Sequence, residues 1–378
     1  MKRIMISVLL VLLLLPSGCN KKPRRIVIGI ALTATYHPAT QLAVREINAH
    51  GGIDGVPVEL TGLDWKFVDS FNPEDILRWA AQFTEEKDLV AVIGHSDSAS
   101  TLSAAAFYNQ HKVPQIVTIA TNPAITNIGD WTFRLCLSDA SQGPALAEYA
   151  VKDWGKRRIA VIYVNDDYGR GLAYLFEKHV RELGGEIVAS IIHRNALAKD
   201  DEALIRSSIM DLKRKGEPDL VVLFQRLAAA RFTLKTLREA GLGSSILGGD
   251  SLGPPSFAKA NPELTEGIHV SQFFQPRSDD PRTTQFLQDF RTFAGHDADY
   301  GDAFAYDAVY LVRDAARYGG PTRAGIKSYL DRLIREKVQT DGIAGVYVLG
   351  PDHDARRALY IAEVRNGAQT FLKTLGPN

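Results

Sequence analysis

The chain of 378 residues is poor in cysteine, with only Cys19 and Cys136. Two cysteines cannot build a disulfide scaffold or a metal site made of several thiolates. The chain also lacks an excess of charge of either sign, because 44 Lys and Arg balance 44 Asp and Glu. Without a basic stripe with interleaved aromatic residues, nucleic acid is not expected as a partner. A hydrophobic content of 45% is nevertheless enough for a large core.

Several motifs of cofactor and metal chemistry are absent from the sequence. There is no HExxH, no CxxC and no Gly-Lys-Ser/Thr phosphate loop, and the one Gly-Lys pair, Gly155-Lys156, continues into an arginine. His296–Asp299 and Asp352–Asp354 contain residues that could ligate a metal, but we interpret both as solvated turns. His95 is interpreted as a hydrogen-bonded packing histidine. We therefore predict no metal and no cofactor.

The first residues are typical of a secretion signal. A basic start, Lys2-Arg3, precedes an apolar run from Ile4 to Leu15, about 12 residues where a membrane span needs roughly 20. The following Leu15–Cys19 resembles a bacterial lipoprotein cleavage box. We predict a signal peptide over 1–18, lipidation at Cys19 and a tether over 19–23, with the protein held at a membrane face in the periplasm or at the cell surface. The alternative is that residues 1–15 pack inside the fold.

The rest of the chain alternates apolar runs with amphipathic stretches, which predicts an α/β fold with doubly wound parallel sheets. The number of units before and after Ser138 is too large for one sheet and favours two similar lobes. The predicted strands are 26–32, 89–93, 113–119, 159–164, 186–192, 220–224, 245–247, 346–349 and 358–364. The predicted helices include 99–109, 200–215, 285–293, 303–318 and 322–334.

Polar residues follow four predicted strands at their carboxyl ends, where parallel sheets bind ligands. Ser98 begins a helix after one strand and is either an N-cap or part of an anion site at the helix N-terminus. Thr121 follows the next strand, and Tyr168 and Asp250 follow strands of the second half. One half offers anion-binding groups and the other an acid and a phenol, a combination that matches a zwitterion.

An enzyme is the rival hypothesis. The segment Gly249–Gly253 matches the GxSxG pattern of serine hydrolases, with Ser251 as nucleophile and Asp279 and His296 as possible partners. The two prolines that follow, Pro254 and Pro255, disfavour the helix that a nucleophile elbow requires. We therefore expect a binding protein without catalytic residues.

The sequence resembles the type I periplasmic solute-binding proteins, close to the leucine/isoleucine/valine-binding branch that serves ABC importers. The likeness extends over nearly all of the chain after the signal. Its motifs are AVREINAHGGIDG (43–55), VIGHSDS (92–98), TNPAIT (121–126), FRLCLSDASQG (133–143), IAVIYVNDDYGRG (159–171) and the stretch 240–250.

The resemblance implies two lobes joined by three crossovers that close over a small ligand. It places lobe 1 at 24–139 and 274–345 and lobe 2 at 140–273 and 346–378. Its partners would be an amino acid or similar solute and the permease subunits of an ABC importer, with a monomeric binding protein. A ligand-sensing role for a signalling partner stays open as an alternative.

The resemblance also implies a ligand site. Ser98 and Thr121 match positions that hold the amino-acid carboxylate, and Ser96 and Ile119 match wall positions. Tyr168 and Asp250 match the groups of the second lobe, with Asp250 as partner of the ligand ammonium.

Four features depart from the family pattern. The loop 32–36 is short, which leaves Tyr36 only a candidate wall residue, and Phe71 and Asp97 stand where the family's disulfide cysteines would be. Arg226 replaces a usual tyrosine, and Gly301, or Tyr300 after a shift of one residue, replaces a usual phenylalanine.

The last two changes remove aromatic surface and add a cation. Arg226 has three candidate roles: it extends into solvent, pairs with Asp250 in the empty cleft, or binds a polar ligand side chain. We expect a polar or larger amino-acid-like ligand rather than leucine.

Overall fold

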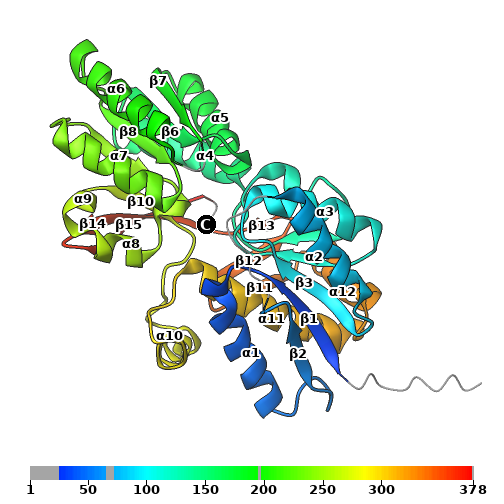
Figure 1. Ribbon diagram of the computed structural model, residues 1–378. Helices are drawn as coiled ribbons and strands as arrows, with labels where there is room; N and C mark the ends of the chain where they lie inside the picture. The colour runs from blue at the N-terminus through cyan, green and yellow to red at the C-terminus, as the bar shows by residue number, and fades with distance from the viewer. Residues whose placement is uncertain (1–24, 65–71, 195–196, 377–378) are drawn as a thin grey trace, which may run out of the picture.

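The computed structural model describes residues 25–64, 72–194 and 197–376, which form two lobes built around separate sheets (Figure 1). Lobe 1 contains both the N-terminal third of the chain and helices from its C-terminal third, whereas lobe 2 contains the middle of the chain and the last strands. The predicted signal peptide, the lipidation site Cys19 and Phe71 lie outside the described residues. Within the described ranges, no helix is long and apolar enough to cross a membrane.

The sheet of lobe 1 has five parallel strands in the order β2-β1-β3-β4-β5. Its strands are β1 (Ile26–Ala31), β2 (Val58–Thr61), β3 (Leu89–Gly94), β4 (Gln115–Val117) and β5 (Thr132–Arg134). Both β1 and β3 are buried along their whole length, because helices cover both faces of the sheet. Ile28 and Ile30 face the cluster that holds α1 and α11, while Val27 and Ala31 face α2 and α3.

The helices of lobe 1 come from both ends of the chain. They are α1 (His37–Ala49), α2 (Pro73–Glu85), α3 (Ser98–Gln110), α10 (Pro281–Ala294), α11 (Tyr300–Gly319) and α12 (Arg323–Arg335), with short 3-10 helices η1 (Ala34–Tyr36) and η2 (Pro123–Ile125). The amphipathic α1 packs against the long, apolar α11. This contact joins segments that are more than 250 residues apart in the sequence.

The sheet of lobe 2 has seven strands in the order β15-β14-β10-β9-β8-β6-β7. The strands are β6 (Arg158–Val164), β7 (Glu186–His193), β8 (Leu220–Phe224), β9 (Ser245–Gly248), β10 (His269–Gln272), β14 (Leu359–Arg365) and β15 (Ala368–Leu375). The strands from β6 to β10 pair in parallel, and β14 and β15 add an antiparallel edge. The edge strand β7 exposes many of its side chains, unlike the fully buried strand β8.

Helices also cover the sheet of lobe 2. They are α4 (Asp139–Glu148), α5 (Asp167–Glu182), α6 (Lys199–Lys215), α7 (Leu227–Glu239), α8 (Pro255–Ala260) and α9 (Pro262–Thr265), with the π-helix η3 (Tyr149–Asp153) and the 3-10 helix η4 (Asp250–Leu252). Helix α4 packs along α5 and therefore belongs to this lobe (Figure 1).

A small antiparallel sheet of three strands, β11 (Gln339–Gly342), β12 (Gly345–Leu349) and β13 (Ala355–Arg356), lies beside lobe 1. The chain passes between the two large sheets three times, between β5 and α4, between β10 and α10, and between β13 and β14. Arg357 lies in the third passage and donates hydrogen bonds to the carbonyls of Leu135 (2.8 Å) and Ala344 (2.5 Å). Its buried guanidinium thus ties the third passage to the first.

The predicted two-lobed α/β fold is confirmed. The predicted apolar runs form strands at their expected places, although the run from 113 to 119 contains only the three residues of β4. Strand β12 begins at the predicted lobe boundary between residues 345 and 346, yet it pairs with β11 and β13. The lobe boundaries themselves stay a prediction.

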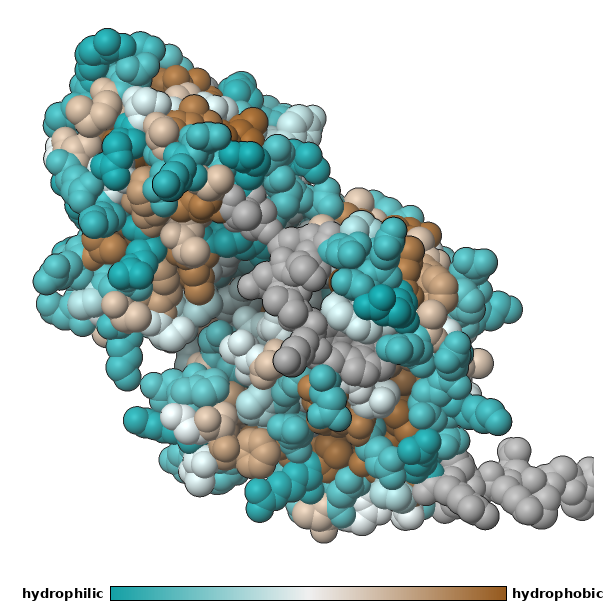
Figure 2. Space-filling model, in the orientation of Figure 1, coloured by the Kyte–Doolittle hydropathy of each residue, from teal (hydrophilic) through white to brown (hydrophobic). Residues whose placement is uncertain are grey.

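On the side drawn in Figure 2, the surface is mostly hydrophilic, with separate hydrophobic patches on both lobes.

Cys136 is fully buried in the first passage. Burial raises the pKa of its thiol, and we assign it a packing role.

Candidate functional site

The candidate site is centred on Asp250, which begins η4 directly after β9. Its carboxylate is 3% exposed, and its Oδ1 lies 3.0 Å from the Tyr168 hydroxyl and accepts a hydrogen bond from Gln142 Nε2 at 2.9 Å. Burial raises the pKa of Asp250, while the hydrogen bonds from Gln142 and Tyr168 act in the opposite direction. The structure thus brings together Tyr168 and Asp250, the two residues of lobe 2 that the sequence analysis predicts.

Tyr168 stands in the first turn of α5, at the carboxyl end of β6. Asp166 caps this helix by accepting a hydrogen bond from the backbone N–H of Gly169 at 2.8 Å. Gly169 packs against the end of β6, where an added Cβ would lie 2.1 Å from the Val164 carbonyl oxygen. Because the helix starts so close to the strand, the Tyr168 ring reaches the end of β9 and the Asp250 carboxylate.

On lobe 1, Thr121 follows β4 and is almost fully buried. Its hydroxyl donates to Asp139 Oδ2 at 3.0 Å, and its carbonyl accepts the backbone N–H of Asp139 at 2.9 Å. Arg134 fixes the neighbouring backbone by donating to the carbonyls of Ala120 and Asn122. The Thr121 loop is therefore held by buried groups on both sides.

Arg134 is itself fully buried and forms a bidentate pair with Asp354, with both N–O distances at 2.8 Å. The interpretation of Asp352–Asp354 as a solvated turn is thus wrong for Asp354, which is 5% exposed. A buried cation requires a paired anion, because an isolated charge costs too much to desolvate. His353 stacks on Phe133 in the same segment.

Ser98 is the first residue of α3 and does not cap it. Asp97 is the N-cap, because its side chain accepts the backbone N–H of Ser100 at 2.9 Å. The interpretation of Ser98 as an N-cap is therefore wrong. Its buried hydroxyl instead accepts the backbone N–H of Asn122 at 3.3 Å, which joins the two predicted carboxylate-binding loops.

The two predicted wall residues of lobe 1 have different surroundings. The Ser96 hydroxyl accepts the backbone N–H of Thr33 at 2.7 Å and so fixes the loop before η1. Ile119 is half-buried against the hydrophobic core. Asn122 reaches across to lobe 2, where its side-chain amide donates to the Asp167 carbonyl at 2.6 Å.

The aromatic surface that the sequence analysis expects to be missing is present. Tyr36, at the end of η1, lies directly against Gly301, where an added Cβ would come within 2.3 Å of its ring. Burial, followed by the charges of Asp299, Asp302 and Asp250, holds the pKa of Tyr36 well above its usual range. Tyr300 is buried beside Gly301, and Asp250 acts on its pKa in the same direction.

Tyr168 thus contacts Asp250 directly, and the charge of Asp250 also acts on two tyrosines of other elements, Tyr36 and Tyr300. The short loop 32–36 explains why the sequence analysis could leave Tyr36 only as a candidate. The absence of a side chain at Gly301 is what provides the space for the Tyr36 ring.

Arg226, the N-cap of α7, has neither of the first two roles expected of it, and the third, binding a polar ligand side chain, stays a prediction. Its Nη2 donates to Asp166 Oδ2 at 2.9 Å, and its guanidinium carbon lies 5.1 Å from the centre of the Tyr168 ring. The side chain is 31% exposed, so it neither extends freely into solvent nor hydrogen-bonds to Asp250. Its Nε is buried and has no hydrogen-bond partner among the described residues.

The opposite lobe also acts on Arg226. Asp97, in the loop before α3, contributes to raising the pKa of Arg226, and Arg226 contributes to lowering that of Asp97, although burial raises the pKa of Asp97 overall. A cation of lobe 2 therefore lies near an anion of lobe 1. The sequence does not predict this proximity, because the two residues are far apart along the chain.

The hydrolase hypothesis finds no support in the surroundings of Ser251. Its hydroxyl donates to the Gln225 carbonyl at 2.7 Å and lies 3.0 Å from the Tyr168 hydroxyl. His296 follows α10 in lobe 1, where its ring packs against Phe290.

His95 hydrogen-bonds Tyr108 at 3.1 Å, and burial lowers the pKa of His95 to about 3. Among the described residues, no group of His, Cys, Asp and Glu side chains has a metal-binding arrangement.

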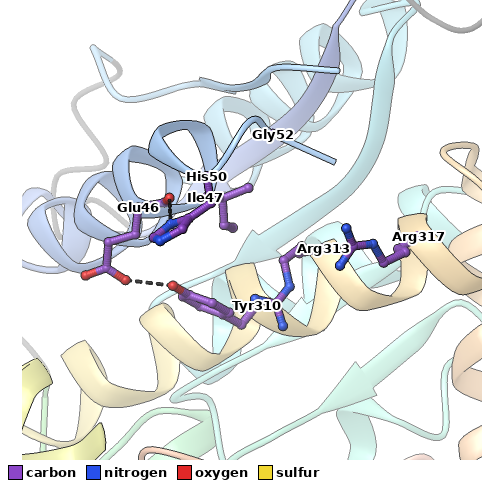
Figure 3. Close-up of a pocket in the computed structure, with 7 residues that line it drawn as sticks. All are labelled: Glu46, Ile47, His50, Gly52, Tyr310, Arg313 and Arg317. Atoms are coloured by element: carbon purple, nitrogen blue, oxygen red, sulfur yellow. Dashed lines mark hydrogen bonds between the residues drawn. The ribbon is translucent and has the colours of Figure 1, made fainter. Parts of the chain in front are cut away.

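A separate cavity of about 110 Å³ lies between α1 and α11, away from Asp250 (Figure 3). The Glu46 carboxylate in its wall accepts hydrogen bonds from the hydroxyls of Tyr306 and Tyr310. The two arginines that line it, Arg313 and Arg317, pair with neighbouring aspartates. Because these polar groups already have partners, we assign this cavity no ligand.

The two lobes, each with polar residues at the carboxyl ends of its parallel strands, define a class of protein, the two-lobed solute-binding proteins. The family model described as periplasmic binding protein matches residues 31–369. The chain belongs to this family, and it is a solute-binding protein of the type that serves ABC importers. This confirms the resemblance that the sequence motifs indicate.

Individual relatives agree. The chain is 28% identical over 302 residues to the Leu/Ile/Val-binding protein homolog 1 of Brucella abortus. The matched segment covers 78% of this chain and 78% of that protein. An amino acid binding protein of Pseudomonas aeruginosa is 28% identical over 247 residues, 64% of this chain and 63% of that protein.

Solved structures extend the comparison. A substrate-binding protein of Desulfitobacterium hafniense in complex with Leu has a TM-score of 0.76 at 27% identity and covers 92% of this chain and all of its own. LivJ of Streptococcus pneumoniae, in complex with isoleucine, has a TM-score of 0.82 at 24% identity, with 93% and 100% of the chains covered. A solute-binding protein of Rhodopseudomonas palustris in complex with benzoate has a TM-score of 0.79 at 19% identity, with 93% and 97% covered. The last two identities are low enough that they establish the fold alone.

Proposed function

We propose that the protein captures an amino acid or an amino-acid-like solute between its two lobes and delivers it to the permease of an ABC importer. The observation that carries this proposal is the buried carboxylate of Asp250, hydrogen-bonded to Tyr168 and linked through Gln142 and Asp139 to Thr121 of lobe 1. A carboxylate in such surroundings requires a cationic partner, and an amino-acid ammonium is one. The relatives whose names or complexes refer to amino acids support the same ligand class.

In this proposal, the ligand carboxylate binds to lobe 1. The N-terminus of α3 and the backbone N–H groups of the Ser98 and Thr121 loops supply donors and a partial positive charge. The Thr121 hydroxyl already donates to Asp139 and its carbonyl accepts from Asp139, so the backbone N–H of Thr121 is the donor it offers to the solute carboxylate. The ligand ammonium binds to Asp250 and Tyr168 on lobe 2.

Four further residues would line the site. Ser96 and Ile119 form its wall on lobe 1, and Gly301 lets the Tyr36 ring form another. Arg226 closes the end near Tyr168, where it favours a polar ligand side chain over an aliphatic one. The three tyrosines and the absence of a side chain at Gly301 also leave an aromatic wall for the apolar part of the solute.

Ligand binding would close the two lobes. Shifting an open-to-closed ratio from 99:1 to 1:99 takes about 5.5 kcal/mol of differential affinity. Hydrogen bonds to charged groups contribute about 1.5–3 kcal/mol each, so a few bonds formed only on closure are enough. Bonds to Asp250 and Tyr168 are of this kind for a ligand first held by lobe 1.

The remaining features complete the proposal. A signal peptide over 1–18 would direct the chain out of the cytoplasm, and lipid on Cys19 would hold it at a membrane face, with 19–23 as tether. Lobe 1 would comprise 24–139 and 274–345, and lobe 2 140–273 and 346–378. The protein would act as a monomer, without catalysis or a cofactor.

The test is a thermal-shift screen of the purified chain with the twenty protein L-amino acids, their amides and benzoate, followed by calorimetry of the best binder. We expect an amino acid to bind, and Asp250→Asn to weaken its binding by about 2–5 kcal/mol, because the ammonium loses its counter-charge. Binding of benzoate but of no amino acid would contradict the proposed ligand class. An Asp250→Asn variant with full affinity would contradict the proposed role of Asp250.

A further inference from the structure

A line of buried side chains connects the candidate ligand groups of the two lobes. It runs from the Thr121 hydroxyl to Asp139 (3.0 Å), from Asp139 to Gln142 (3.0 Å), from Gln142 to Asp250 (2.9 Å) and from Asp250 to Tyr168 (3.0 Å). Gln142 and Asp139 are fully buried, and the other members are at most 4% exposed. The line passes through the start of α4, directly after the first passage between the lobes.

Gln142 is the only member of this line that contacts both carboxylates through one group. Its Nε2 donates one hydrogen bond to Asp139 Oδ1 and the other to Asp250 Oδ1. Its Oε1 accepts a hydrogen bond from the Ser271 hydroxyl at 3.1 Å. Because a side-chain amide has two N–H donors, both are used here, and their acceptors fix the orientation of the group.

The carboxylates that Gln142 joins lie among several ionisable groups. These are Arg134, Arg226, Cys136, Tyr36, Tyr168 and Tyr300. Burial and the charge of Asp250 raise the pKa of Asp139 to about 8. At neutral pH, Asp139 is therefore mostly protonated.

The two amide hydrogens act on this pair in a defined direction. A hydrogen bond donated to a carboxylate favours its charged form, and Gln142 lowers the pKa of both acids against the effect of burial. Asp250 needs that charge to bind a cationic group. Tyr168 and Gln142 both donate to its Oδ1, so together they fix the orientation of the carboxylate.

We propose that Gln142 is a positioning residue for ligand binding, whose amide group keeps the Asp250 carboxylate oriented and charged by bonding it together with Asp139. This inference rests on the proposed function, in which Asp250 binds the ligand ammonium. Gln142 itself acts through Asp250 and does not touch the solute. Asp139, bonded to Thr121 through both backbone and side chain, anchors the arrangement to lobe 1.

The variant for the test is Gln142→Met, which keeps the length and volume of the side chain but removes both donors. Gln115→Met is the matched control. Gln115 is also fully buried and bonds the Gly94 carbonyl and the Thr132 hydroxyl, but it contacts neither acid. A second control, Ser271→Ala, removes the donor to Gln142 Oε1 and leaves the two bonds to the acids in place.

The first measurement needs no ligand. The ionisation of Asp139 and Asp250 is followed by NMR of protein labelled with ¹³C at the aspartate carboxyl carbons, with Asp139→Asn and Asp250→Asn to assign the signals. In Gln142→Met, we expect the apparent pKa of Asp250 to rise by about one pH unit, a tenfold change in proton affinity. Both controls are expected to leave it unchanged. An unchanged Asp250 in folded Gln142→Met would overturn the inference.

The second measurement uses the protein L-amino acid that gives wild type its largest thermal shift. We expect Gln142→Met to bind it at least tenfold more weakly at pH 7, and the acidic limb of its affinity-against-pH curve to move to higher pH. Gln115→Met should lose stability with the curve in place. If wild type binds no amino acid, the proposed function fails, while the NMR result still decides on Gln142. Loss of affinity in Gln142→Met without a shift of the curve would mean a packing role and would also overturn the inference.

Discussion

The contact between Gly301 and Tyr36 gives the sharpest prediction about the shape of the site. An alanine at position 301 would place its Cβ 2.3 Å from Tyr36 Cε1 and 2.6 Å from Cζ, well inside van der Waals contact. The backbone at Gly301 is in the first turn of α11 and accepts an alanine. In an unobstructed helix, alanine is more favourable than glycine by about 1 kcal/mol. Forcing a side chain into filled space costs about 1–3 kcal/mol.

We therefore expect Gly301→Ala to be neutral to destabilising by about 2 kcal/mol, the difference between these opposing effects. Because the Tyr36 ring has to move, the best-bound amino acid should also bind about tenfold more weakly. Urea denaturation and calorimetry measure the two effects. In a Tyr36→Ala background, where the obstructing ring is gone, Gly301→Ala should instead stabilise the chain. Stabilisation of the same size in both backgrounds would refute the packing of Tyr36 against Gly301.

Three further changes test the buried charges. The Asp139 carboxyl has a folded-state pKa of about 8 against 3.8 in the unfolded chain, so the wild-type protein should lose stability as the pH rises from 4 to 8. Asp139→Asn removes this titration. In denaturation series, the free energy of unfolding of the variant should therefore fall less over that pH range than that of the wild type. Asp354→Ala leaves the Arg134 guanidinium buried and unpaired and should cost about 3–5 kcal/mol in urea denaturation; a loss below 1 kcal/mol would contradict the pairing. Arg226→Leu removes the ion pair with Asp166 and should weaken the best-bound polar amino acid at least tenfold, about 1.4 kcal/mol, while aliphatic amino acids hold or gain; calorimetry that finds both classes unchanged would remove Arg226 from the site.

The strands that the sequence predicts well are those whose side chains are buried on both faces. Strands β1, β3 and β8 consist almost wholly of apolar residues, so their pattern does not depend on knowing their neighbours. The apolar pattern does not predict the short strand β5, because this strand ends in the charged residue Arg134. An arginine becomes a core residue only when Asp354, 220 positions further along the chain, pairs with it.

The site shows the same division. Tyr168 and Asp250 follow predicted strands, and their meeting depends only on parallel strands ending at one edge. The placement of Tyr36 and Arg226 depends instead on contacts with distant residues. The Tyr36 ring occupies the space beside Gly301, which has no side chain, and Arg226 pairs with Asp166. Such contacts are set by three-dimensional packing between distant segments, so no local sequence pattern predicts them.

The central claim is that the two lobes close over a solute held by both. Its most direct test is small-angle X-ray scattering of the chain with and without a saturating concentration of the amino acid that calorimetry identifies as the best binder. We predict a smaller radius of gyration in the bound state for wild type, and a smaller change for Asp250→Asn, which loses the bond that draws lobe 2 onto the ligand. An unchanged radius of gyration in wild type with the amino acid demonstrably bound would contradict the claim.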